Sequence, residues 1–198
     1  MEVQTVFAAL LLVLLSGTAA ARPGPLLAPK EATMNFIKAS CSSTEYPNLC
    51  FQSLSVYANK IQTNPVQLAH TALSISLNST AKASALISML SRRPMRPREA
   101  AAMKDCVETF GDAVEELRGS LAEMGRLRGA DFGFRLSNIQ TWVSAAITDQ
   151  STCMDGFDEG GAAANGAVKE EVRVEVVRVS QLTSNALGLI NSLASSPP

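Results

Sequence analysis

Residues 97–124 have the sequence PREAAAMKDCVETFGDAVEELRGSLAEM, and this stretch decides the fold. Its apolar residues recur at steps of three and four, which places them on one face of an α-helix. They are Met103, Cys106, Phe110, Ala113, Leu117, Leu121 and Met124. Pro97 suits the first turn of a helix, where its missing N–H is not needed, and we expect the helix to end near residues 126–129. Such a helix must bury its apolar face against other elements. The stretch therefore predicts one member of a larger helical core.

Helical spacing also appears on both sides of this stretch. Asn64 and Pro65 form a strong helix start, because asparagine caps and proline fits the first turn. Apolar residues follow at helical spacing until the segment RRPMRP at 92–97 interrupts them. A third helix is predicted over about 134–148, with Leu136, Ile139, Val143 and Ala146 facing inward. We expect a polar connector over 149–153 and a flexible loop over 156–166, which is rich in glycine and alanine.

The last apolar segment fits two structures over a short window. Val172, Val174 and Val176 alternate with charged residues as in a strand. The wider window keeps helical spacing, and no partner strand is evident elsewhere, so we predict a helix. The residues with this spacing are Val172, Val176, Val179, Leu182, Ala186, Leu189 and Leu193. The predicted fold is all-α, a four-helix up-and-down bundle over 64–195 preceded by a helical hairpin over 31–60.

The four cysteines are Cys41, Cys50, Cys106 and Cys153, and four cysteines allow three pairings. We predict that the pairs are sequential. The segment Tyr46-Pro47-Asn48 favours a turn, which would bring Cys41 and Cys50 together and clamp the hairpin. The second disulfide would then tie the helix over 97–124 to the end of the third helix. A zinc site is disfavoured, because no Cys-x-x-Cys is present and the chain has a single histidine.

The N-terminal segment indicates where the chain is sent. Residues 6–15 are an unbroken apolar run too short to span a bilayer, and Ala19-Ala20-Ala21 offers small residues for cleavage. We expect a signal peptide over 1–21, a linker over 22–30, one helical domain over 31–195 and secretion. The chain holds 17 basic and 18 acidic residues, and removing the leader takes away Glu2 alone. The charges then balance, so neither nucleic acid nor a membrane is an expected partner.

Catalytic chemistry is poorly represented in this sequence. A hydrolase site needs a base beside its nucleophile, and the single histidine, His70, lies in an ordinary helical segment where we expect it to be half-exposed. We expect no enzymatic activity, no cofactor and no metal. Asn78-Ser79-Thr80 is a sequon for N-glycosylation, and it falls within a predicted helix.

An acidic stripe lies beside the apolar stripe of the helix over 97–124. It consists of Asp105, Glu108, Asp112, Glu115 and Glu116, again at steps of three and four. Like charges arranged in this way destabilise a helix by a few tenths of a kcal/mol per pair. The stripe is either a solvated face of the bundle or a docking surface for a basic or polar partner.

Four segments together resemble a known family. The run DCVETFGDAVEEL at 105–117 is similar to a motif of the plant invertase and pectin methylesterase inhibitors. The first cysteine loop, with YPNLC at 46–50, resembles that family's first disulfide loop. The segments TWVSAA at 141–146 and TCMDGF at 152–157 resemble its third-helix end and fourth cysteine, and SNAL at 184–187 resembles its C-terminal helix. The resemblance covers about 30–195.

The resemblance implies a fold and a function. Members of this family are secreted proteins of the plant cell wall, or apoplast, without enzymatic activity, and their disulfides pair sequentially. The pectin methylesterase branch binds that enzyme in a one-to-one complex and covers its substrate cleft. Carried over by motif, the expected contact residues are Glu108, Asp112 and Glu115, together with Thr152 and Asp155 around the fourth cysteine.

Three alternatives can be weighed against the same residues. Invertase inhibitors resemble a plug with a Pro-Lys-Phe segment, but residues 126–133 here are RLRGADFG, which favours pectin methylesterase as the target. The same module also begins pectin methylesterase precursors, and because no catalytic domain follows before Pro198 we expect a free inhibitor. A carrier of an apolar ligand would need a cavity. We expect a filled core instead, built from large residues such as Phe110, Leu117, Trp142 and Leu189.

Overall fold

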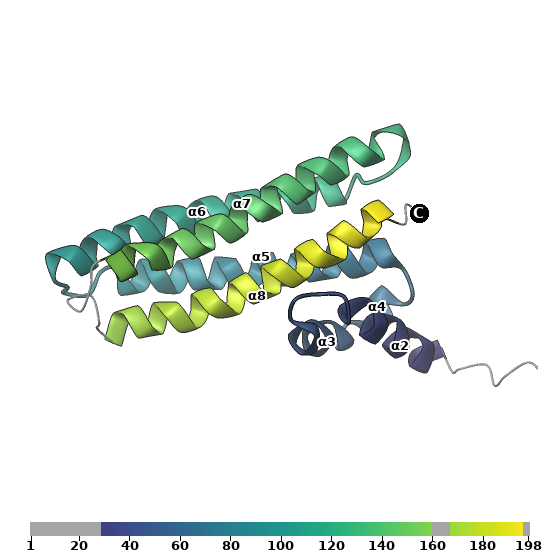
Figure 1. The fold of residues 1–198 in the computed structure, drawn as a ribbon, viewed down its shortest axis with the longest axis horizontal. Coiled ribbons are helices and arrows are strands. Elements are labelled where there is room, and N and C mark those ends of the chain that lie inside the picture. The colour runs from purple at the N-terminus through teal and green to yellow at the C-terminus, as the bar shows by residue number, and fades with distance from the viewer. Residues whose placement is uncertain (1–28, 160–166, 196–198) are drawn as a thin grey trace, which may run out of the picture.

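The computed structural model describes residues 29–159 and 167–195, and these ranges contain helices and no strand. Figure 1 shows the long helices side by side, with short helices packed at one end. The short ones are α2 (Pro29–Cys41), α3 (Pro47–Ser55) and α4 (Ala58–Ile61). The long ones are α5 (Pro65–Leu90), α6 (Pro97–Met124), α7 (Phe132–Glu159) and α8 (Ala167–Ser195), and the 3₁₀ turn η1 (Gly129–Asp131) joins α6 to α7. The predicted all-α four-helix fold is confirmed.

The predicted caps and stripes account for the long helices. Asn64 Oδ1 accepts a hydrogen bond from the backbone N–H of Gln67 at 2.9 Å, which caps α5 one residue before Pro65. Along α6 the predicted apolar stripe is buried, apart from Leu121, which is partly buried. Every residue of the predicted α8 stripe is buried as well, whereas Val174 is 57% exposed. The valine alternation in α8 is therefore a local coincidence on a helix.

Helix α7 is longer than predicted and corrects two expectations. It runs to Glu159, through the expected polar connector and the first residues of the expected loop; the rest of that loop, 160–166, lies outside the described residues. The buried face continues after Ala146 through Gln150, Cys153 and Phe157, all fully buried. A buried glutamine hid this continuity, because polarity normally marks an exposed position.

Trp142 is also a correction, since it was expected in the core and is 36% exposed. Its ring lies against Gly119 of α6, where an added Cβ would stand 3.4 Å from two ring carbons. Phe110 and Leu117 are fully buried, and Leu189 is buried, as expected. The tryptophan therefore covers the outside of the α6–α7 contact.

A layer of polar side chains divides the bundle core into two apolar clusters. Gln150 Nε2 of α7 donates to Thr80 Oγ1 of α5 at 3.2 Å and to Thr183 Oγ1 of α8 at 3.1 Å. The hydroxyls of Ser76 and Thr183 are 2.7 Å apart and share a hydrogen bond. All four residues are fully buried. These bonds pair most of the polar atoms of the layer and fix the register of three helices, while Gln150 Oε1 is buried without a partner among the described residues.

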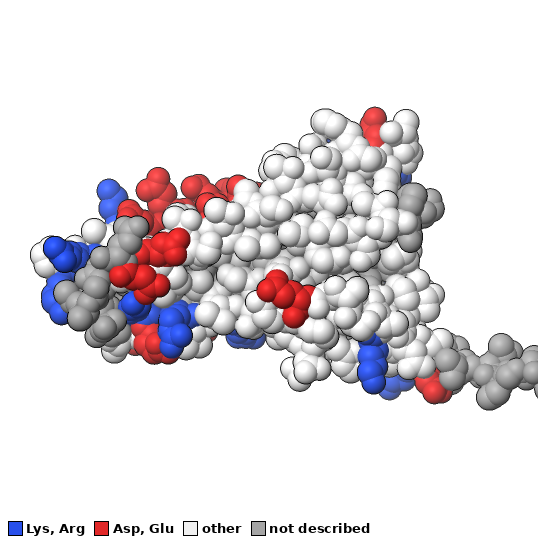
Figure 2. All heavy atoms as spheres, viewed as in Figure 1, with Lys and Arg blue, Asp and Glu red and all other residues white. Residues whose placement is uncertain are grey.

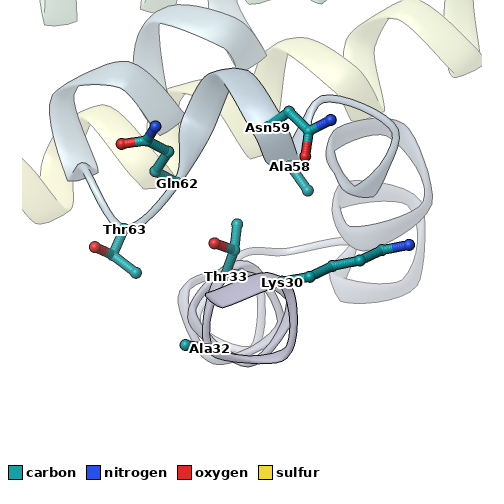
Figure 3. A pocket seen from close by; sticks show the side chains of 7 residues that line it. All are labelled: Lys30, Ala32, Thr33, Ala58, Asn59, Gln62 and Thr63. Carbon is teal, nitrogen blue, oxygen red and sulfur yellow. The ribbon is translucent and has the colours of Figure 1, made fainter. Parts of the chain in front are cut away.

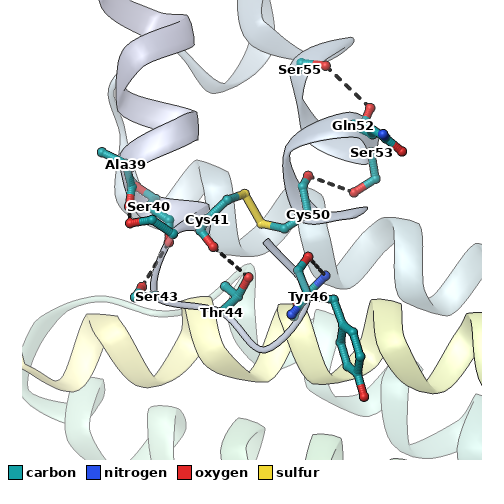
Figure 4. The surroundings of a disulfide bond; sticks show 12 residues. Ala39, Ser40, Cys41, Ser43, Thr44, Tyr46, Cys50, Gln52, Ser53 and Ser55 are labelled. Carbon is teal, nitrogen blue, oxygen red and sulfur yellow. Dashed lines mark hydrogen bonds between the residues drawn. A yellow bond between two sulfur atoms is a disulfide. The ribbon is translucent and has the colours of Figure 1, made fainter. Parts of the chain in front are cut away.

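Both disulfides have the predicted pairing. Cys41 and Cys50 join α2 to α3, with their Cα atoms 5.6 Å apart. Figure 4 shows this bridge and the hydrogen bond that the hydroxyl of Thr44 donates to the carbonyl of Cys41, at 2.8 Å. Cys106 and Cys153 join α6 to α7 with a Cα separation of 4.3 Å. Because α7 continues to Glu159, this second bridge lies within both helices rather than at the end of one.

Candidate functional site

The Cys106–Cys153 bridge holds α6 and α7 together beside an acidic groove. The groove has a volume of about 460 Å³. It is lined by Asp105, Glu108, Thr109 and Asp112 from α6 and by Thr152, Asp155 and Gly156 from α7. Gly156 lies close to α6, where an added Cβ would stand at the ordinary van der Waals distance of 3.6 Å from Ala102. We call this feature the α6–α7 groove.

Four of the five predicted contact residues meet in this groove. Glu108, Asp112, Thr152 and Asp155 are all exposed and line it together, although they come from two separate motifs. Thr152 donates its hydroxyl proton to the carbonyl of Thr148 at 2.9 Å, which leaves the oxygen lone pairs to accept a bond from outside. Glu115 is exposed but does not line the groove, and it forms an ion pair with Arg118.

Negative charge in the groove is not balanced by the nearby ion pairs. None of the salt bridges within the described ranges includes Asp105, Glu108, Asp112 or Asp155. The sequence has no lysine or arginine from 136 to 168, so α7 contributes no cation beside the groove. Figure 2 shows the charged side chains of this face gathered mainly at its left end, with acidic ones along the upper edge and basic ones beside them, while most of the remaining face is uncharged. The groove is therefore suited to donors of hydrogen bonds and to cations.

A pair of carboxyl groups next to the groove escaped sequence analysis. Glu116 of α6 faces Asp149 of α7, and its Oε2 is buried without a hydrogen-bond partner among the described residues. Burial, then the neighbouring Asp149 and then Asp112 raise the pKa of Glu116 to about 7. Burial also raises the pKa of Asp149, and Asp112 adds to that shift. Glu116 was part of the predicted stripe, but Asp149 was assigned to a connector, so no single pattern brought them together.

Alternative chemical centres are not supported within residues 29–159 and 167–195. No group of three or more His, Cys, Asp and Glu side chains in these ranges could hold a metal ion. None of the helices described there is sufficiently long and apolar to cross a membrane. His70 lies half-buried on α5, away from the groove lining, and burial followed by the charge of Lys60 lowers its pKa.

A larger hollow lies at the other end of the molecule. Its volume is about 630 Å³, and it lies between α2, α4 and the start of the loop that follows α4. Figure 3 shows Thr33 pointing from α2 toward α4, with Asn59, Gln62 and Thr63 around the opening. This hollow contains no predicted contact residue and no cluster of like charge. The α6–α7 groove is smaller, but it joins charge, hydroxyl groups and two independent sequence motifs.

Comparison with known proteins agrees with this fold and these motifs. The sequence model of the family described as Plant invertase/pectin methylesterase inhibitor matches residues 35–189. The chain is 45% identical to the 21 kDa protein of Daucus carota, over 96% of this chain and 93% of the carrot protein. It is 46% identical to Pectinesterase inhibitor 9 of Arabidopsis thaliana, over 80% of each protein.

A solved structure matches the fold. The crystal structure of mutant form A of a pectin methylesterase inhibitor from Arabidopsis superposes with a TM-score of 0.63 at 19% sequence identity. The match covers 81% of this chain and 96% of that one, and at this identity it supports the fold alone. The family model and the two sequence relatives show that the chain shares an ancestor with these proteins. The chain belongs to the plant invertase/pectin methylesterase inhibitor family.

Proposed function

We propose that this protein is a secreted inhibitor of pectin methylesterase that binds the enzyme one-to-one and covers its substrate cleft. The observation that carries the proposal is the 46% identity to Pectinesterase inhibitor 9 over 80% of both chains, within a family defined by such inhibitors. The inhibitor would thereby limit the demethylation of cell-wall pectin.

The α6–α7 groove is the proposed contact with the enzyme. Carboxylates of Glu108, Asp112 and Asp155 accept hydrogen bonds, and the Thr152 oxygen adds a neutral acceptor between the two helices. Hydrogen bonds to charged groups contribute about 1.5–3 kcal/mol each when they are desolvated. A basic or polar surface of the enzyme would fit this arrangement. Inhibition would then come from occupying the cleft, with no bond made or broken.

Pectin methylesterase is a better target for this chain than invertase. The segment that corresponds to the invertase inhibitors' Pro-Lys-Phe is the α6–α7 connection, residues 126–133, and it lacks that tripeptide. Here Leu127 is buried, which ties the connection to the bundle core, and Arg135 bridges Glu123 at 2.7 Å across it. Residues 128–131 of the connection are exposed, so the preference for pectin methylesterase rests on the absent tripeptide.

The proposed location is the extracellular space of the plant cell wall. The predicted leader over 1–21 lies outside the described residues, so this proposal rests on its sequence. Two disulfides formed from all four cysteines fit an oxidising compartment.

A demethylation assay tests the proposal directly. Purified protein with both disulfides formed is added to pectin methylesterase, and separately to acid invertase, over a range of concentrations. Demethylation should stop at saturation while sucrose hydrolysis continues. Native mass spectrometry of the same sample tests the carrier alternative, which requires a retained apolar ligand. Invertase inhibition with unaffected demethylation would transfer the proposal to the other branch of the family.

A further inference from the structure

The sequon Asn78-Ser79-Thr80 lies in the middle of α5, with its two functional residues in opposite environments. Asn78 is exposed, and the residues three, four and seven positions later on the same side of the helix, Ala81, Lys82 and Ala85, are exposed too. Two of these three are alanines, so little side-chain bulk surrounds the Asn78 amide. A sugar chain on Asn78 would extend into solvent without displacing the core.

Thr80, in contrast, is fully buried in the polar layer of the core. Its Oγ1 accepts the hydrogen bond from Gln150 Nε2 of α7, and that same amide group also donates to Thr183 of α8. The hydroxyl of Thr80 is therefore inaccessible once α5, α7 and α8 have packed together. Reaching it requires opening of the core, whose free energy approaches that of global unfolding.

N-glycosylation requires both the asparagine amide and the hydroxyl two residues later, which together define the sequon. We propose that Asn78 is an N-glycosylation site that is modified only before the bundle closes, so that folding buries the Thr80 hydroxyl and ends the period of modification. This inference rests on the secretion proposed above, because the modification takes place in the secretory pathway.

The modification is a group transfer from a lipid-linked oligosaccharyl diphosphate. The Asn78 amide nitrogen forms a bond to the anomeric carbon of the first sugar. The bond from that carbon to the diphosphate oxygen breaks, and the lipid diphosphate leaves with the electron pair. One amide proton passes to a base of the transferase. Neither an oxidant nor a reductant is required.

Secretory expression of the full chain in yeast provides the first test. The peptide that contains Asn78 should carry a glycan, and an amidase should remove it and leave aspartate at that position. Asn78→Gln should lose the glycan without changing the core. Thr80→Val should also lose it, because the sequon hydroxyl is removed. Thr80→Ser keeps a hydroxyl and should keep the glycan. Unmodified Asn78 in the secreted wild-type protein would overturn the proposal.

A second test separates the order of events from secretion itself. Unglycosylated chain is offered to purified oligosaccharyltransferase with its lipid-linked donor, either folded with both disulfides or reduced and unfolded. The unfolded chain should be modified at Asn78 and the folded chain should not. Equal modification of the two forms would overturn the claim that folding closes the site. The readout is glycan attachment, so it does not depend on whether the chain inhibits pectin methylesterase.

Discussion

The side chain of Asn185 makes two hydrogen bonds with the backbone of Tyr46. Asn185 Oδ1 accepts from the Tyr46 N–H at 2.9 Å, and Asn185 Nδ2 donates to the Tyr46 carbonyl at 3.0 Å. The same turn gains a bond from Ser184 Oγ to Glu45 Oε2 at 2.5 Å. Thr44 also lies close to Gly188 of α8, where an added Cβ would stand at the ordinary van der Waals distance of 3.5 Å from the Thr44 methyl group. One short segment of α8 therefore holds the first disulfide loop on the bundle.

Asn185→Ala should destabilise the protein, because it leaves the partly buried N–H of Tyr46 without its partner, while the Tyr46 carbonyl keeps the bond from the Cys50 N–H. The expected loss is about 1–3 kcal/mol in the free energy of unfolding, measured by urea denaturation with the disulfides intact. Ser184→Ala is the matched control: it removes one exposed bond from the next residue and should cost less. Equal stabilities for Asn185→Ala and the wild type would show that the loop does not depend on this clamp.

The Glu116–Asp149 pair should make stability fall as the pH rises. Because the folded-state pKa of Glu116 lies above the ordinary value of 4.5, at about 7, the folded protein binds an extra proton between these values. The protonated pair is tolerated below about pH 4.5, and its ionisation destabilises the fold as pH rises through about 7. After allowance for solvent screening, the effect is on the order of 1–2 kcal/mol.

Glu116→Gln isolates this effect. The stability of this variant should not fall between pH 4.5 and 7 as that of the wild type does. The variant should therefore be more stable than the wild type at pH 8, with little difference at pH 4. Thermal unfolding of both proteins across this range gives the comparison. His70 contributes in the opposite direction, because its lowered pKa makes the fold less stable as pH falls. Both proteins contain His70, so subtracting one stability from the other at each pH removes this contribution. Parallel curves for the two proteins would mean that Glu116 ionises normally.

Asp112→Ala should weaken binding to pectin methylesterase if the α6–α7 groove is the interface. A desolvated hydrogen bond to this carboxylate corresponds to about 1.5–3 kcal/mol, roughly ten- to 150-fold in affinity. Thr152→Ala should cost less, about 0.5–1.5 kcal/mol. Both residues are exposed, so folding should survive, and removing Asp112 relieves repulsion on Glu116.

Glu115→Ala is the control for the groove variants, because Glu115 is on the same helix but outside the lining. Inhibition constants for the folded variants decide the matter. Unchanged affinity for both Asp112→Ala and Thr152→Ala would show that the acidic stripe is a solvated face and that the interface lies elsewhere on the bundle.

Removing the second disulfide should be more costly than any of these single changes. The chain-entropy model gives about 4 kcal/mol for closing a loop as long as that between Cys106 and Cys153. A Cys106→Ala/Cys153→Ala double variant should therefore unfold at much lower urea concentration than the wild type. Peptide mapping without reduction should find Cys41–Cys50 and Cys106–Cys153 in the wild type, and a Cys50–Cys106 link would refute the fold.

Most of this fold was predictable because buried apolar residues recur at helical spacing. The prediction failed where a polar residue is buried or a large aromatic residue is exposed. The stripes of α6 and α8 follow directly from apolar residues at helical spacing. The end of α7 did not, because Gln150 is a polar residue in the core and its partners Thr80 and Thr183 are distant in sequence. Trp142 was misplaced because a large aromatic ring can cover a helix contact from outside, here over Gly119.

The candidate site was predictable in part for a similar reason. The acidic residues of α6 share one helical face, so their spacing revealed them. Thr152 and Asp155 came from the family resemblance, and only the packing of α7 on α6 brings them to the same groove. The Glu116–Asp149 pair depends entirely on that packing, which spacing along one segment does not encode.

Calorimetric titration of pectin methylesterase with the wild-type protein, run beside the same titration of acid invertase, tests the central claim most directly. The account predicts saturable one-to-one binding to the esterase, accompanied by loss of demethylation, and no heat of binding with the invertase. Binding to the invertase alone, or no binding to either enzyme by a folded protein with both disulfides, would contradict it.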